Sequence, residues 1–122
     1  TWINKVSDIW FATKSSNFFF NQDSELKKIN ESSQNNVIEM GISNFWYDIL
    51  NIQTQKSMKG DRPHQLIERI ITASSSKLNW ILDPFAKNGS VGLISNSMGR
   101  RFIGFEVNKD KVLMSMKRID RG

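Results

Sequence analysis

One stretch constrains the fold of this chain more than any other: residues 80–90, Trp-Ile-Leu-Asp-Pro-Phe-Ala-Lys-Asn-Gly-Ser. Its first three residues predict a short buried strand that ends at an acid, Asp83, and a tight turn containing Gly89 then leads into a helix. In open α/β sheets, ligands bind at the carboxyl ends of the strands. A helix N-terminus also presents unpaired backbone N–H groups. Asp83 is therefore expected where the polar groups of a cofactor would bind.

The residues that follow complete a strand–helix–strand unit. Val91 and Ile94 share one helical face, and Gly99 is a helix stop. Residues 101–106, Arg-Phe-Ile-Gly-Phe-Glu, predict a second strand that again ends in an acid, Glu106. An acid about 20 residues after the glycine turn suits the two hydroxyls of a ribose. The sequence thus predicts a βαβ unit with a ribose-containing cofactor at its carboxyl edge.

Three motifs in this part of the chain resemble those of the DNA amino-methyltransferases. Residues 83–90 resemble that family's D-P-F-x-G-S-G-T motif. Residues 99–106, Gly-Arg-Arg-Phe-Ile-Gly-Phe-Glu, resemble the segment that follows it, and residues 62–71 resemble the proline and L-x-E-R-I-I helix that precede it. The resemblance is strong over residues 59–120. The order of motifs matches the β group, in which the target-site motif precedes the cofactor motif.

The resemblance implies a Rossmann-like α/β fold with three layers, αβα, which is incomplete here because complete members of the family are longer. It implies S-adenosylmethionine as the cofactor, with Asp83 near the methionine amino group and Glu106 on the ribose hydroxyls. The methyl acceptor would be an exocyclic amino group of a base flipped out of double-stranded DNA, N6 of adenine rather than N4 of cytosine. The implied cofactor-binding residues are Asp83, Pro84, Phe85, Ala86, Gly89, Ser90 and Glu106.

Two departures from the family pattern bear on activity. The first glycine of the turn is Lys87 here, and the serine is Asn88. Because glycine permits close backbone approach, Lys87 is expected to crowd the methionine end of the cofactor. The family's catalytic motif, an Asp, Asn or Ser before Pro-Pro and an aromatic residue, is absent, since Pro63 and Pro84 are the only prolines. No catalytic residue is predicted in this chain, and transfer would need a missing N-terminal half or a companion subunit.

Other interpretations of the same residues remain open. The chain, or its parent protein, would alternatively be a degenerate, non-catalytic methyltransferase-like module that binds DNA or a partner subunit. An unrelated α/β protein in which Asp83 caps a helix is less favoured, because two motifs occur at the family's spacing. A nicotinamide-dependent dehydrogenase is least favoured, because the turn lacks the closely spaced glycines of G-x-G-x-x-G.

The chain is predicted to be a portion of one methyltransferase domain. Residues 1–61 are expected to be irregular or β, with a polar loop over residues 21–36, and residues 62–122 to form a helix plus the βαβα cofactor-binding half. Residues 5–13 are β-prone, and the aromatic run Phe18–Phe20 is expected to pack in a core rather than stack on a base.

The charge of the chain favours an anionic partner. The net charge is +5 and the isoelectric point is about 9.7, as in many nucleic-acid-binding proteins. Lys56, Lys59 and Arg62 lie close together and are candidate DNA contacts, although a solvated loop is the favoured explanation. A final helix that Asn108 caps is expected to place Val112, Met116 and Ile119 on its inward face. Its dipole accounts for Lys117, Arg118 and Arg121 near its C-terminal end.

The composition also argues against a metal site and against a membrane-spanning segment. The chain has no cysteine and a single histidine, His64, which is expected to be exposed, so no metal is predicted. The lack of cysteine is compatible with a reducing, cytoplasmic location. No apolar run approaches the roughly 20 residues of a membrane span.

Overall fold

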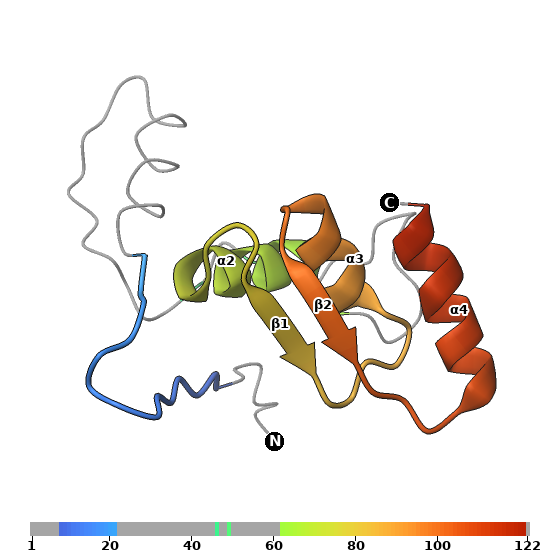
Figure 1. Cartoon of the computed structure of the whole chain (residues 1–122), viewed down its shortest axis with the longest axis horizontal. Coiled ribbons are helices and arrows are strands. Elements are labelled where there is room, and N and C mark those ends of the chain that lie inside the picture. Colours follow the sequence, from blue (N-terminus) through green and yellow to red (C-terminus); the bar gives the residue numbers. More distant parts are fainter. Residues whose placement is uncertain (1–7, 22–45, 47–48, 50–61, 122) are drawn as a thin grey trace, which may run out of the picture.

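The computed structural model describes residues 8–21, 46, 49 and 62–121. Its elements follow one another as α2 (His64–Ser74), β1 (Trp80–Asp83), α3 (Ser90–Ser97), β2 (Arg101–Gly104) and α4 (Lys109–Asp120), as Figure 1 shows. β1 and β2 are parallel neighbours, with Asp83 opposite Gly104. The predicted βαβ unit is confirmed, and the described part is an incomplete Rossmann-like α/β fold.

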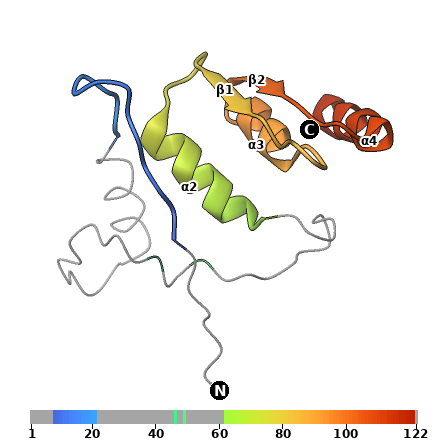
Figure 2. The ribbon, with the colours of Figure 1, turned by 90° about the horizontal axis from the view of Figure 1, so that it is seen from below.

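The two faces of this small sheet differ. Ile81 of β1 and Phe102 of β2 are half-buried on the face that the helices cover. Trp80 and Leu82 point to the other face, where they are 60% and 62% exposed. Figure 2 shows α2 and α3 together on one side of the strands. Within the described residues, the sheet therefore has one helical layer, and its second face is open.

The core lies between α2 and the βαβ unit. Ile67 and Ile71 of α2 are buried against Ile94 of α3, as the helical spacing of the apolar residues predicts. Ile81, Val91 and Met98 extend this cluster. Because this contact joins α2 to α3, it fixes the position of α2 beside the turn that links β1 to α3.

Helix α3 lies at the centre of the described fold, where neighbouring side chains pack directly against its backbone. A Cβ atom on Gly92 would lie 2.5 Å from Ile119 Cδ1 and 2.7 Å from the Phe102 ring, so a side chain there would force these two side chains to shift. The helix thus packs against β2 on one side and α4 on the other. This packing brings α4 within reach of the turn that precedes α3.

The helix ends largely agree with the sequence. Asn108 caps α4, because its Oδ1 atom accepts a hydrogen bond of 3.1 Å from the Lys111 N–H, and Gly99, at φ 74°, follows α3. Two expectations need correction. The second strand ends at Gly104 rather than at Glu106, and Met116, expected to face inward, is 56% exposed while Ser115 is the buried residue of α4.

The described N-terminal segment, residues 8–21, contains no strand, so the strand-forming residues 8–13 are irregular, one of the two structures expected for residues 1–61. The run Phe18–Phe20 is half exposed rather than part of the core. The Phe11 ring instead lies edge-on to those of Phe18 and Phe20, at centroid distances of 5.6 and 5.4 Å. The polar loop beyond residue 21 and the boundary at residue 61 lie outside the described residues, and the domain division stays a prediction.

Candidate cofactor site

The two strand ends are joined at the carboxyl edge of the sheet. The Phe105 N–H donates to the Asp83 carbonyl oxygen at 2.9 Å, and the Ala86 N–H donates to the Phe105 carbonyl oxygen, also at 2.9 Å. Because the strands are parallel and neighbouring, Asp83 and the Glu106 segment leave the sheet at the same edge. This is the edge at which open α/β sheets bind their ligands.

The Asp83 side chain stabilises the turn that follows β1. Its Oδ1 atom accepts a hydrogen bond of 3.0 Å from the Phe85 N–H, which fixes the chain direction after β1. The structure gives its Oδ2 atom no hydrogen-bond donor among the described residues. One carboxylate oxygen therefore holds the turn, and the other is left to accept a hydrogen bond from a ligand.

The turn from residue 84 to residue 89 uses two left-handed positions. Lys87 has φ 46° and Gly89 has φ 75°, and the Gly89 N–H donates to the Ala86 carbonyl oxygen at 2.8 Å. A Cβ atom on Gly89 would lie 2.6 Å from Ser115 Cβ of α4. Gly89 is also the N-cap residue of α3, which has no side-chain cap hydrogen bond, and the N-terminal end of a helix favours an anion.

The Arg118 side chain on α4 contacts this turn and the start of α3. Its Nη1 atom donates to the Asn88 carbonyl oxygen at 3.3 Å and lies 3.4 Å from Ser90 Oγ. From the sequence alone, the dipole of the final helix explains a cation at position 118. In the structure, the Arg118 guanidinium also donates a hydrogen bond to the turn before α3. No local pattern indicates the contact, because its partners lie 30 and 28 residues earlier in the chain.

Glu106 is held in its ionised form. The backbone N–H of Asn108, which donates to Oε1 at 2.9 Å, lowers the pKa of this carboxyl group most. Partial burial opposes the shift, and the Lys111 charge and the N–H groups of Val107 and Lys87 lower the pKa further. An ionised carboxylate only accepts hydrogen bonds, as binding to the hydroxyls of a ribose requires.

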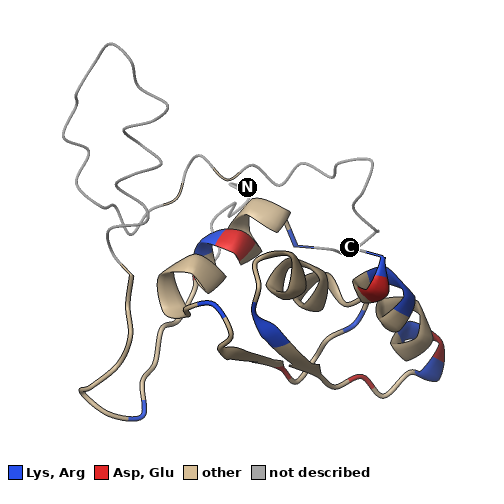
Figure 3. Ribbon diagram, turned by 45° about the horizontal axis from the view of Figure 1, so that its top comes forward, with Lys and Arg blue, Asp and Glu red and all other residues tan. Residues whose placement is uncertain are grey.

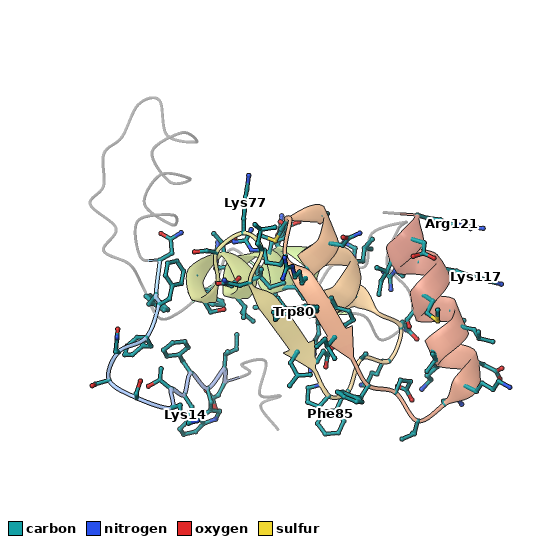
Figure 4. The ribbon with its side chains drawn as sticks, viewed as in Figure 1. Lys14, Lys77, Trp80, Phe85, Lys117 and Arg121 are labelled. Atoms are coloured by element: carbon teal, nitrogen blue, oxygen red, sulfur yellow. The ribbon has the colours of Figure 1, made fainter. Side chains whose placement is uncertain are left out.

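A hollow of about 210 Å³ opens beside this edge. Its walls combine the start of α2, the turn after β1 and the first residues of α3. Phe85, labelled in Figure 4 near the lower ends of the strands, is 79% exposed at its rim. The residues that line the hollow are Arg62, Ile67, Asp83, Phe85, Ala86, Lys87, Ser90 and Val91. Among the predicted cofactor residues, Pro84, Gly89 and Glu106 are not part of this lining.

The candidate DNA contacts are only partly described. Arg62 is exposed and lines the hollow, whereas Lys56 and Lys59 lie outside the described residues. Figure 3 shows further basic residues on α4, which carries Lys109, Lys111, Lys117 and Arg118. His64 is not exposed as expected, because it is half-buried and its Nε2 atom is enclosed without a hydrogen-bond partner from the described part of the chain.

The described part of the chain lacks the features of a metal site and of a membrane-spanning helix. No group of three or more His, Cys, Asp or Glu residues is arranged there to hold a metal ion. No helix there is long and apolar enough to cross a membrane.

Comparison with known proteins identifies the family. A sequence profile of the DNA methylase family matches residues 3–117, nearly the whole chain. The chain belongs to the DNA methylase family. The type II methyltransferase M2.DpnII of Streptococcus pneumoniae is 30% identical to this methylase chain over 110 residues, which cover 88% of the chain and 38% of that relative.

The chain is also similar to a second curated relative and to a solved structure. The DNA adenine methyltransferase YhdJ of Escherichia coli K12 is 41% identical over 59 residues, covering 48% of this DNA methylase chain and 20% of YhdJ. The solved structure of the M1.HpyAVI–SAM complex is 31% identical, with a TM-score of 0.48, and the match covers 51% of this chain and 30% of that one. The chain therefore spans less than two fifths of the length of these relatives.

Proposed function

We propose that this chain is the cofactor-binding part of a DNA methyltransferase that acts on an exocyclic amino group. The observation that carries the proposal is the meeting of Asp83, Glu106 and the N-terminus of α3 at one edge of two parallel strands. Membership of the DNA methylase family supports it. N6 of adenine is favoured over N4 of cytosine, because YhdJ, a relative 41% identical over its matched residues, is a DNA adenine methyltransferase.

The residues at this edge fit S-adenosylmethionine. Asp83 offers a carboxylate oxygen to the methionine ammonium group, and ionised Glu106 accepts hydrogen bonds from the ribose hydroxyls. The backbone from Phe85 to Ser90 would surround the methionine portion. Ligand pockets usually measure about 300–1,000 Å³, so the hollow of about 210 Å³ accommodates one end of the cofactor rather than the whole.

When bound, S-adenosylmethionine supplies a methyl group carried on a sulfonium sulfur. The chain's own residues bind and orient this group. They do not supply the side chain that would hold a flipped base, because the sequence contains no Pro-Pro-aromatic motif. The target amino group would be held by a missing N-terminal half or by a companion subunit. Double-stranded DNA is the expected substrate of the complete enzyme, and the cytoplasm is its expected location.

Calorimetric titration of the 122-residue chain with S-adenosylmethionine tests the proposal. Asp83→Asn is the informative variant, because an amide oxygen can still accept from the Phe85 N–H while the negative charge is lost. We expect binding that this substitution weakens by roughly tenfold, the size of one charge-assisted hydrogen bond. Asp83→Ala, which removes both roles, should weaken binding further.

The alternative function is a non-catalytic module that binds DNA or a partner subunit. The absent catalytic motif favours it. A chain that binds a DNA duplex in a salt-dependent way but shows no heat of binding with millimolar S-adenosylmethionine would support this alternative and contradict the proposal.

A further inference from the structure

Lys87 occupies the position of a glycine in the family's turn, and its backbone keeps a conformation typical of glycine. Its φ is 46°, in the left-handed region, and Leu78 is the one other non-glycine residue in the described chain with a positive φ. The turn around Lys87 is still closed by the hydrogen bonds of Ala86 and Gly89. A lysine held there at a cost of about 1–2 kcal/mol is an outlier that invites a functional explanation.

The Lys87 side chain lies at the candidate cofactor site, where its positive charge can bind an anionic group of a ligand. Lys87 is exposed and lines the same hollow as Asp83, four residues earlier in the same turn. Its backbone N–H helps to lower the pKa of Glu106, which lies two residues beyond the end of β2. Arg62, at the start of α2, is the other cation of the lining. The hollow therefore presents one carboxylate and two cationic side chains.

The amino-acid end of S-adenosylmethionine carries opposite charges on neighbouring atoms. Its ammonium group requires an acceptor, which Asp83 provides, and its carboxylate requires donors. The carboxylates of Asp83 and Glu106 have no donor to offer, whereas a lysine ammonium has three. The first N–H groups of α3, which lack a side-chain cap, add a favourable field for an anion at the same place.

We propose that the Lys87 ammonium group binds the α-carboxylate of the cofactor, so that Lys87 and Asp83 recognise the two charges of its amino-acid end. The inference rests on the proposed function and reverses the expectation that Lys87 crowds the methionine. The substitution of glycine by lysine then replaces close backbone approach by an ion pair. Lys87 is preferred to Arg62 because it belongs to the same turn as Asp83, whose geometry the structure fixes by hydrogen bonds.

The test measures dissociation constants by calorimetry for two ligands, S-adenosylmethionine and its decarboxylated analogue, which retains the ammonium group. We expect Lys87→Met to weaken binding of S-adenosylmethionine by about 3- to 10-fold and to leave binding of the analogue unchanged. Lys87→Arg should retain most of the affinity. Arg62→Met, at the other cation of the hollow, tests the competing assignment. Lys117→Met, at an exposed position of α4 outside the hollow, is the control and should change both ligands little and equally.

Each of the following results would overturn the inference. Equal loss for both ligands in Lys87→Met would mean that the carboxylate is not recognised, and tighter binding by Lys87→Gly would mean that the lysine crowds the site. Selective loss in Arg62→Met would assign the carboxylate to Arg62. If the unsubstituted chain binds neither ligand, the proposed function fails, and the inference with it. If the chain binds both ligands and Lys87→Met changes neither dissociation constant, the inference alone fails.

Discussion

The guanidinium of Arg118 donates a hydrogen bond of 3.3 Å to the carbonyl oxygen of Asn88, which lies 30 residues earlier in the chain. The final helix of the described fold thereby holds the turn on which the candidate cofactor site is built. Ser90 Oγ, 3.4 Å from the same nitrogen, gives Arg118 a second contact at the start of α3. The position of the turn therefore depends on α4 as well as on β1.

Arg118→Met should loosen this turn while keeping most of the side chain's apolar contact. Because both hydrogen bonds are long and the guanidinium is half-buried, we expect a loss of about 1 kcal/mol in the free energy of unfolding. Denaturant titration measures this loss. Lys117→Met removes a neighbouring exposed charge and is the control; an equal loss in both variants would show that charge alone, and not the contact with Asn88, matters.

Gly89→Ala tests the close contact between the turn and α4. An alanine there has an unfavourable φ of 75° and a Cβ atom 2.6 Å from Ser115 Cβ. The two effects together should cost about 2–4 kcal/mol in stability. Gly99→Ala is matched in φ, at 74°, but its Cβ atom meets only Lys77 Cγ at 3.9 Å. It should cost only about 1–2 kcal/mol, and thermal unfolding of both variants would measure the steric part as their difference.

Ile71→Ala tests whether α2 is fastened by its buried face. Ile71 is 3% exposed and lies against Ile94, so the truncation should cost about 2–4 kcal/mol. Ile70→Ala, at the adjacent and 36% exposed position, should cost about 1 kcal/mol or less. Denaturation midpoints that fall equally in the two variants would contradict the assignment of this core.

Glu106→Gln tests the carboxylate beside β2 through its pH dependence. The pKa of Glu106 in the folded chain lies below its ordinary value of 4.5, chiefly because of the Asn108 N–H. The unfolded chain therefore binds more protons between these two pKa values, and the carboxylate stabilises the fold above pH 4.5. This stability is lost as the pH falls through the lowered pKa of the folded state.

We therefore expect Glu106→Gln to be less stable than the unsubstituted chain at neutral pH and to approach it in acid. Urea titrations at a series of pH values measure the difference. Asp120→Asn, at the end of α4, gives the effect of removing any one negative charge. A deficit for Glu106→Gln that stays constant down to the most acid pH would mean that size or shape, and not ionisation, causes it.

Much of the described fold follows from local sequence. The apolar run before Asp83, the glycine turn and the spacing of Ile67 and Ile71 act over a few residues, so each predicts its own element. The same locality explains where the structure differs from the local preferences. Residues 8–13 have strand-forming side chains but no strand partner in the described structure, and Met116 has a helical position that matches the apolar stripe although Ser115 is the residue that packs.

The sequence by itself determined the order of the elements, the parallel βαβ unit and the presence of an acid after each strand, because backbone preference and hydrophobic period are encoded in neighbouring residues. Only the tertiary structure decided that Arg118 holds the Asn88 carbonyl, that α4 leaves no room for a side chain on Gly89, and that Lys87 shares a hollow with Asp83. The contacts with α4 join residues far apart in the chain, and the hollow is enclosed by three separate elements. Such arrangements depend on how whole helices and strands pack against one another rather than on the preference of any one segment.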